Sequence, residues 1–297
     1  LAILLFMLLT GALRFVLGLI LATVNPLIAA LYTFFFATLI GKQITKAVLT
    51  TGILSGVILL MQDLSITSLS LMPEALIAYV LAASSPTHSI SKEVYDGGWA
   101  RLGKMANGKK FYDILLPLGP DYGGPLFFAH YSFLGLDPRQ LSDEYADYWE
   151  QNVAQTRINY KYCVENPRGW KGYGRNVWGL TACDVPGGYA ANSPTEDFGT
   201  IAPTAALSSF PYTPYESMEA LHYYYYILGE KAFGEYGFCD AFNLQEDWFS
   251  PSYLAIDQGP IIIMMENYRS GLLWNLFMKN EDVRAGLNSL GFSFRIQ

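Results

Sequence analysis

Two carboxylates stand where helices are predicted to begin, and both could take part in acid–base chemistry. Glu74 lies in the first turn of an apolar helix predicted over residues 73–83. Asp257 lies in AIDQGP, just before a helix start predicted at residue 259. The positive end of a helix stabilises a charged carboxylate, which suits Asp257 to the role of a general base. The same effect works against Glu74 as an acid unless apolar surroundings or another carboxylate outweigh it. The alternative for both is an ordinary acid at a helix start.

A second feature is the loop over residues 165–191, which reads ENPRGWKGYGRNVWGLTACDVPGGYAA. Its aromatic side chains include Trp170, Trp178 and Tyr189, and its carboxylates include Asp184. Carbohydrate sites need this mixture, because an aromatic face covers the apolar face of a sugar while directional polar groups bond its hydroxyls. The alternative is that these aromatic residues form the lid of a helical core.

The histidines and cysteines give little support to a metal centre. The three histidines are isolated from one another and from the three widely spaced cysteines, which form neither a disulfide framework nor a CxxC pair. His130, in LFFAHYSF, is either a core residue or a ligand contact. The sequence has no phosphate-binding loop, dinucleotide glycine fingerprint or GxSxG nucleophile motif. We therefore expect neither a metal nor a cofactor.

Helix signals recur through the second part of the chain and predict an all-α domain. Helices are expected over residues 73–83, 142–163, 213–228 and 259–278, and a short final helix after Asn280. The run Thr213-Pro214-Tyr215-Glu216 has the form of a capping box with proline in the first turn. The alternation typical of a strand is clear only in FSFRI, over residues 292–296.

The composition separates the chain into two segments. Its 297 residues are 52% hydrophobic, 15% aromatic and 15% charged, with a net charge of −7. This excludes a disordered protein, and the acidic balance argues against a nucleic-acid partner. No Asp or Glu precedes Asp63. We therefore expect hydrophobic helices over residues 1–60 and a separate domain over residues 61–297.

The hydrophobic segment has the length of a membrane span. Residues 15–40 read FVLGLILATVNPLIAALYTFFFATLI, and about 20 apolar residues suffice to cross a bilayer. Shorter or weaker apolar runs cover residues 1–13 and 47–61. A signal peptide would be shorter and would end at a small-residue cleavage site. We expect residues 1–60 to attach the protein to a membrane; the alternative is a set of buried helices in a large helical domain.

Several long motifs resemble one known family. They are PLFFAHYSFLGLDPR (125–139), YWEQN (148–152), GYGRNVWGLTACDVPGGYAA (172–191) and SYLAIDQGPIIIMMENYRSGLLW (252–274). The chain is similar, over about residues 73–292, to the bacterial glucoamylase-like family. That family includes endo-β-1,2-glucanases and a region of cyclic β-1,2-glucan synthases.

The resemblance implies an (α/α)6 toroid, a barrel of paired helices, and an inverting glycoside hydrolase that acts on β-glucan, with a β-1,2 linkage expected. It implies that Glu74 is the general acid and Asp257 the general base. The carboxyl groups of such a pair lie roughly 6.5–9.5 Å apart. The substrate contacts that it implies are His130, Tyr131, Trp170, Trp178, Asp184 and Tyr189.

Two departures from the family pattern bear on the function. Family members have a polar, Trp- and Gly-rich approach to the acid, whereas this chain has SLSLMP. The family also supplies helices upstream of this glutamate, where this chain has the hydrophobic segment. We therefore expect a toroid that is incomplete on its N-terminal side, as in a fragment or fusion, unless the apolar helices complete it.

Three functions are compatible with these observations. The first is a membrane-attached hydrolase whose catalytic domain faces the periplasm or another extracytoplasmic space. The second is a non-catalytic glycan-binding module of a membrane assembly for glucan synthesis or export. The third is a structural remnant that neither binds nor cleaves glucan.

Overall fold

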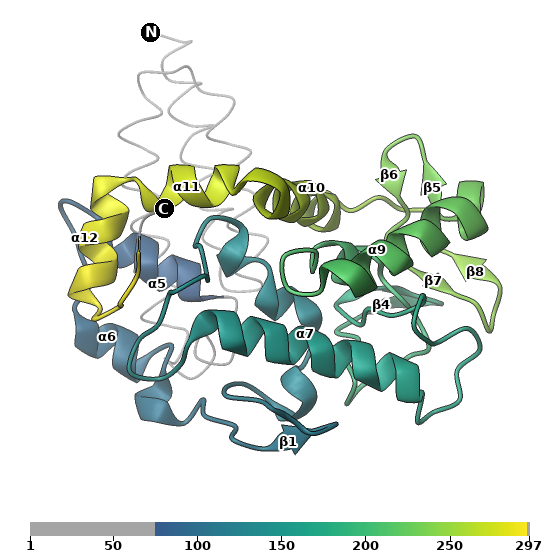
Figure 1. Ribbon diagram of the computed structural model, residues 1–297, viewed down its shortest axis with the longest axis horizontal. Helices are drawn as coiled ribbons and strands as arrows, with labels where there is room; N and C mark the ends of the chain where they lie inside the picture. Colours follow the sequence, from purple (N-terminus) through teal and green to yellow (C-terminus); the bar gives the residue numbers. More distant parts are fainter. Residues whose placement is uncertain (1–74, 296–297) are drawn as a thin grey trace, which may run out of the picture. The chain divides into compact units, whose positions relative to one another are not determined.

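The computed structural model describes residues 75–295, which lie within one compact unit that begins at Ser70 (Figure 1). Eight α-helices form most of the regular structure of these residues. They are α5 (Leu76–Ala83), α6 (Lys92–Gly97), α7 (Tyr148–Glu165), α8 (Pro203–Leu207), α9 (Pro214–His222), α10 (Ala255–Ser270), α11 (Leu272–Met278) and α12 (Glu281–Ser289). The helix-rich fold predicted from the sequence is confirmed for this part of the chain.

Four antiparallel hairpins lie between the helices of the described residues, and the all-α prediction missed them. They are β1 (Lys110–Phe111) with β2 (Ile114–Leu115), β3 (Cys183–Val185) with β4 (Gly188–Ala190), β5 (Phe233–Gly234) with β6 (Gly237–Phe238), and β7 (Phe242–Asn243) with β8 (Trp248–Phe249). Strands of two or three residues are too short for alternation to reveal them. The predicted strand FSFRI is reduced to one bridge, between Ser293 and Ser142.

Four short 3-10 helices lie between α6 and α7. They are η2 (Arg101–Gly103), η3 (Asp121–Gly123), η4 (Leu126–Ala129) and η5 (Ser132–Leu134), and η7 (Gly229–Lys231) comes later. The π-helix η6 (Tyr223–Leu228) continues α9. Pro214 occupies the first turn of α9 as predicted, but Thr213 does not cap it, because its hydroxyl donates to the Ser209 carbonyl at 3.4 Å.

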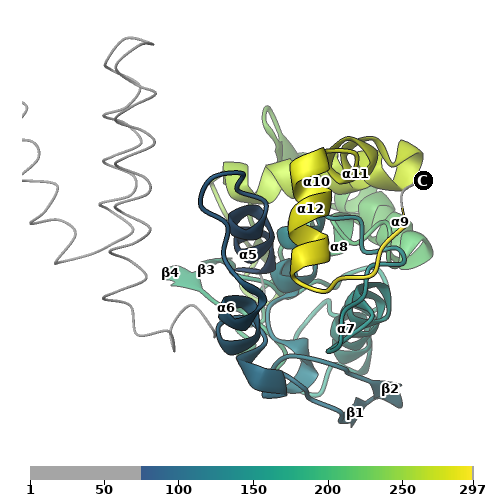
Figure 2. The ribbon, with the colours of Figure 1, turned by 90° about the vertical axis from the view of Figure 1, so that its left-hand side faces the viewer.

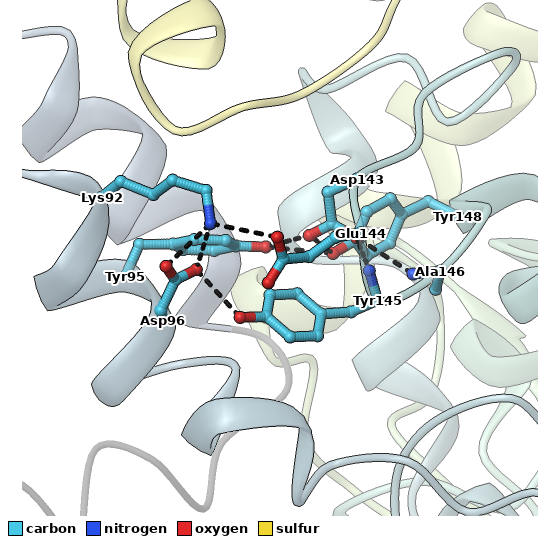
Figure 3. A network of polar contacts seen from close by, with 8 residues as sticks. All are labelled: Lys92, Tyr95, Asp96, Asp143, Glu144, Tyr145, Ala146 and Tyr148. Carbon is cyan, nitrogen blue, oxygen red and sulfur yellow. Dashed lines mark hydrogen bonds and ion pairs between the residues drawn. The ribbon is translucent and has the colours of Figure 1, made fainter.

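The long helix α7 begins at Tyr148 rather than at residue 142, because Asp143 organises the preceding turn (Figure 3). The Oδ1 atom of Asp143 accepts the backbone N–H groups of Tyr145 and Ala146 at 2.8 and 3.0 Å. Its Oδ2 atom accepts the hydroxyls of Tyr95, from α6, and Tyr148. The network therefore links the start of α7 to α6 and excludes the turn from the helix.

Buried amide side chains along α7 hold the loops that surround it. Gln155 donates to the Gly123 carbonyl at 2.8 Å, and Asn159 both donates to the Leu180 carbonyl and accepts the Leu180 N–H, each at 3.0 Å. Buried backbone groups need such partners, since an unpaired one costs free energy. The helix α7 thus holds in place the loop segments that precede η4 and the β3–β4 hairpin.

The helix predicted over residues 259–278 is divided into α10 and α11. The helix α10 begins at Ala255, so Asp257 lies in its first turn rather than before it. Gly271 adopts a left-handed conformation, with φ of +68°, and ends α10. The Oδ1 atom of Asn267 accepts the N–H groups of Leu273 and Trp274, which lie in the first turn of α11.

The first and last helices of the described residues pack side by side, as Figures 1 and 2 show for α5 and α12. Gly286 of α12 makes this approach possible. A Cβ atom at this position would lie 2.3 Å from Ser84 Oγ and 2.7 Å from Ser84 N. Because the backbone of Ser84 belongs to the end of α5, a larger residue would force the helices apart.

Several predictions fall on residues outside the described part. These are the hydrophobic helices over residues 1–60, the boundary near residue 60, and Glu74. Within residues 75–295, no helix is long and apolar enough to cross a membrane. Membrane attachment through residues 1–60 therefore stays a prediction.

We expect Gly286→Ala to destabilise the fold by about 1–3 kcal/mol, the usual cost of overpacking a close contact. Thermal and urea unfolding of the full chain measure this cost. Gly97→Ala is the matched control, since nothing lies within 4 Å of the added Cβ atom. Equal stabilities of the two variants would contradict the role assigned to Gly286.

Candidate active site

Asp257 is a buried acid at the start of α10. Its side chain is only 1% exposed. The Tyr131 hydroxyl donates a long hydrogen bond of 3.4 Å to Oδ1, and the Thr204 hydroxyl donates to the Asp257 carbonyl at 2.8 Å. The Oδ2 atom is buried and finds no donor among the described residues. One oxygen of this carboxyl group therefore accepts a hydrogen bond from a tyrosine, while the other oxygen accepts none from the described residues.

A second buried acid, Asp240, faces Asp257 from the segment between β6 and β7. It is also 1% exposed, and its Oδ2 atom accepts the backbone N–H of Asp184 at 2.7 Å. Its Oδ1 atom has no donor among the described residues. The carboxyl groups of Asp240 and Asp257 lie within hydrogen-bonding reach of each other. A proton on either one supplies the missing donor.

Asp184, on β3, completes what we call the carboxyl cluster (Asp184, Asp240 and Asp257). Its Oδ2 atom accepts the hydroxyls of Ser250, at 2.7 Å, and Ser252. Ser252 also accepts the Asp240 N–H through its carbonyl at 3.0 Å. The segment between β8 and α10 therefore holds two of the three acids in place.

The electrostatics of the cluster favour a bound proton. Burial and the neighbouring Asp240 carboxylate raise the pKa of Asp257 to about 8, although the Tyr131 hydrogen bond acts in the opposite direction. Burial also raises the pKa of Asp240. The expectation that the helix N-terminus keeps Asp257 charged is therefore wrong, because desolvation and a like charge outweigh the helix dipole.

Tyr131 and Tyr189 lie beside the carboxyl cluster. Tyr189, on β4, is paired in register with Asp184 on β3 and is 59% exposed. Burial and the charge of Asp257 raise the pKa of Tyr189 to about 12, and the same two causes raise the pKa of Tyr131 further. Both phenols therefore stay protonated and can donate hydrogen bonds. The exposed Tyr189 ring can also stack on a sugar.

The structure thus brings together four of the predicted site residues: Tyr131, Asp184, Tyr189 and Asp257. It places two others in the core. His130 is 1% exposed, its Nε2 atom bonds Ser209 Oγ at 2.9 Å, and burial lowers its pKa to about 3. Trp178 is fully buried and donates from Nε1 to the Glu216 carbonyl at 3.2 Å. These contacts give both side chains a structural role, and their contact with substrate stays a prediction.

Trp170 belongs to a separate arrangement around Asp197. Its Nε1 atom donates to Asp197 Oδ2 at 2.9 Å, and the hydroxyls of Tyr162 and Tyr173 donate to the same carboxylate at 2.9 and 2.8 Å. Gly199 packs against the indole, since a Cβ atom there would lie 2.6 Å from the ring. These contacts give Trp170 a structural role, and its contact with substrate stays a prediction.

Comparison with known proteins identifies the family. The model of the family Glycoamylase, described as "Putative glucoamylase", matches residues 68–281. The chain belongs to this family.

Among residues 75–295, no group of three or more His, Cys, Asp or Glu side chains is arranged to hold a metal ion.

Several Glycoamylase relatives are similar to most of this chain. An exo β-1,2-glucooligosaccharide sophorohydrolase (non-reducing end) of Parabacteroides distasonis is 47% identical over 236 residues, which is 73% of this chain and 33% of the relative. The endo-β-1,2-glucanase of Chitinophaga pinensis, solved with sophorotriose and glucose, is 53% identical with a TM-score of 0.73, over 74% of this chain and 54% of that one.

A solved "putative glucoamylase" of Bacteroides uniformis is 58% identical with a TM-score of 0.74, over 75% of this chain and 55% of that one. The chain thus spans about half the length of these solved relatives and a third of the sophorohydrolase.

Sequence reasoning about this Glycoamylase domain missed Asp240. The residue lies in GFCDAF, between the apolar pairs Phe238-Cys239 and Ala241-Phe242. An acid within an apolar run is a signal of burial, and buried acids concentrate at functional sites. That signal could have placed Asp240 among the candidates, although not beside Asp257.

We expect Asp257→Asn to flatten the pH dependence of stability. In the folded chain Asp257 keeps its proton up to about pH 8, whereas in the unfolded chain it loses the proton near its ordinary pKa of about 4. The wild-type protein therefore loses stability as the pH rises from about 4 to 8. Between pH 5 and pH 8, the free energy of unfolding of the variant should therefore rise relative to that of the wild type by on the order of 2–4 kcal/mol.

Urea unfolding at both pH values measures this difference. Asp247→Asn, which removes an exposed acid paired with Lys231, is the control and should follow the wild type. Parallel pH dependence in wild type and Asp257→Asn would show that Asp257 has an ordinary pKa in the folded chain.

Proposed function

We propose that this domain hydrolyses β-1,2-glucan by an inverting mechanism in which Asp257 is the general base. The observation that carries the proposal is a buried carboxyl group, Asp257, which lies beside two tyrosines, one of them well exposed. Two similar proteins, the sophorohydrolase and the endo-β-1,2-glucanase, act on β-1,2-linked glucose chains by name. The substrate and the activity are inferred from them.

Three residues of the described site have a chemical task in this mechanism: Asp257, Tyr131 and Tyr189. Asp257 accepts a proton from water, which then attacks the anomeric carbon on the face opposite the leaving group. A carboxylate with a raised pKa is a stronger base once ionised. The Tyr131 hydroxyl, 3.4 Å from Oδ1, orients the carboxyl group. Tyr189 offers its exposed ring to the sugar.

The acid in this proposal is Glu74, which precedes the described residues. It protonates the oxygen of the departing sugar, in keeping with the role that the family resemblance implies. We further propose that the helices of residues 75–295 form part of an (α/α)6 toroid, and that residues 1–60 attach the domain to a membrane on its extracytoplasmic side. The family assignment supports the first statement, and the apolar run over residues 15–40 supports the second.

A second candidate function is a glycan-binding module without catalysis, which belongs to a membrane assembly for glucan synthesis or export. The observation in its favour is the segment SLSLMP before Glu74, which departs from the polar, Trp- and Gly-rich approach to the acid that the family resemblance implies. This candidate retains the tyrosine surface and requires no acid. Binding of β-1,2-glucan without release of reducing ends would distinguish it from the hydrolase.

We expect Asp257→Asn and Glu74→Gln each to lower kcat on linear β-1,2-glucan by about 10²–10⁴-fold, the usual contribution of a general base or acid. A reducing-end assay measures the rate, and NMR of fresh products should show the inverted α-anomer. Asp247→Asn, an exposed acid, is the control and should keep wild-type activity. Full activity in either test variant would remove that residue from the mechanism.

We expect Tyr189→Ala to weaken β-1,2-glucan binding by about five- to tenfold, equivalent to the loss of about 1 kcal/mol of ring stacking. Tyr189→Phe keeps the ring and should bind within about twofold of the parent, since stacking is retained. Calorimetry in the Asp257→Asn background measures binding without turnover. Equal affinities of the Ala and Phe variants would exclude stacking at this position.

A further inference from the structure

Asp240 has no task in the mechanism above, yet it is among the most completely buried acids of the described residues. Its Oδ1 atom and the Oδ2 atom of Asp257 are both buried without a donor. Each carboxyl group is within hydrogen-bonding reach of the other. Since neither oxygen has another donor among the described residues, a proton on one acid is the donor available to the other.

The fold holds Asp240 in this orientation from two sides. Its Oδ2 atom accepts the N–H of Asp184 at 2.7 Å, and its own backbone N–H donates to the Ser252 carbonyl at 3.0 Å. The neighbouring Ala241 carbonyl accepts the N–H of Ser250 at 2.8 Å. One oxygen of Asp240 is thus fixed by a backbone donor, and the other remains available to the neighbouring Asp257 carboxyl group.

The surroundings supply no positive charge to separate the two acids. The titratable groups that act on Asp257 are Asp240 and Asp184, Tyr131 between η4 and η5, Tyr189 on β4 and Cys183 on β3. None of them is cationic. No ion pair within residues 75–295 includes Asp240 or Asp257. Two carboxylates buried together in this way cannot both be ionised at low cost.

We propose that Asp240 and Asp257 hold one proton between them and that Asp240 is the positioning residue of the general base. The proton lies between Asp257 Oδ2 and Asp240 Oδ1, so that the pair carries a single negative charge. This inference rests on the proposed function for the role of Asp257 in catalysis, but the shared proton itself does not.

The pair then works as one base with two ends. When the attacking water gives its proton to Asp257 Oδ1, the shared proton moves from Asp257 Oδ2 to Asp240 Oδ1. One O–H bond of water and the Oδ2–H bond break, while an Oδ1–H bond forms on each acid. Both acids end neutral. The water oxygen bonds to the anomeric carbon as the glycosidic bond breaks, and the departing sugar oxygen takes its proton from Glu74, the acid of the proposed mechanism. Loss of one proton to solvent restores the pair.

Infrared spectroscopy of the full chain without substrate tests the shared proton, because a protonated carboxyl group has a C=O band separate from those of carboxylates. In the wild type this band should persist at neutral pH and disappear near pH 8, where Asp257 titrates. In Asp240→Asn the like charge is lost and the amide can donate to Asp257. The midpoint should therefore fall by about one pH unit or more.

Asp257→Asn removes the other member of the pair, so that any remaining C=O band of a protonated acid in the cluster belongs to Asp240. The pH midpoint at which this band disappears should also be lower than in the wild type. Asp197→Asn is the matched control, since it removes a buried carboxylate that is held by tyrosine and tryptophan donors outside the cluster. Its band should titrate as in the wild type. Circular dichroism confirms that each variant is folded before titration.

On β-1,2-glucan, Asp240→Asn should lower kcat by about 10–100-fold with KM within about twofold, since the residue acts through Asp257 rather than on the sugar. A wild-type spectrum without the band at neutral pH, or an unshifted midpoint in Asp240→Asn, would overturn the proposal. A band that titrates as expected in a wild type that does not cleave β-1,2-glucan would support the shared proton and overturn the proposed function instead.

Discussion

The site contains two buried carboxyl groups in contact, and the surrounding residues must stabilise them. Asp240 and Asp257 are each 1% exposed and face each other without a cation. Such a contact is tolerated only where a proton is bound and where the outer oxygens have donors. The backbone N–H of Asp184 and the hydroxyl of Tyr131 are those donors. The β3–β4 hairpin, the η4–η5 segment and the first turn of α10 are positioned accordingly.

The cost of this arrangement is offset by contacts elsewhere in the fold. A buried acid with a raised pKa weakens the folded state at neutral pH, because the unfolded chain ionises it freely. The amide side chains of α7, such as Gln155 and Asn159, satisfy buried loop carbonyls, and Gly286 lets α12 approach α5 closely. Stability is thus supplied by a well-packed scaffold, while the site keeps a group that destabilises it.

The sequence predicted the helices more successfully than the details that depend on distant contacts. Asp257 was recognisable from its place at a helix start, whereas its partner Asp240 is 17 positions earlier in the sequence, and only the tertiary fold joins them. The start of α7 was misplaced because the Asp143 turn competes with the helix. His130 and Trp178 have residue types that suit sugar contacts, but burial gives them structural tasks, and residue type alone does not reveal burial.

The two halves of the proposed chemistry draw on different parts of the chain. The base half needs only residues between Tyr131 and Asp257, all within the described unit and held by its own hydrogen bonds. The acid half depends on Glu74 and on the SLSLMP segment before it, which departs from the family pattern. Changes before α5 can therefore alter proton donation without disturbing the carboxyl pair. In the proposed mechanism, a chain with an intact base half and an altered acid half would keep the proposed glucan-binding surface while its rate of cleavage changed. The proposed activity therefore depends on the residues around Glu74 as well as on the carboxyl pair.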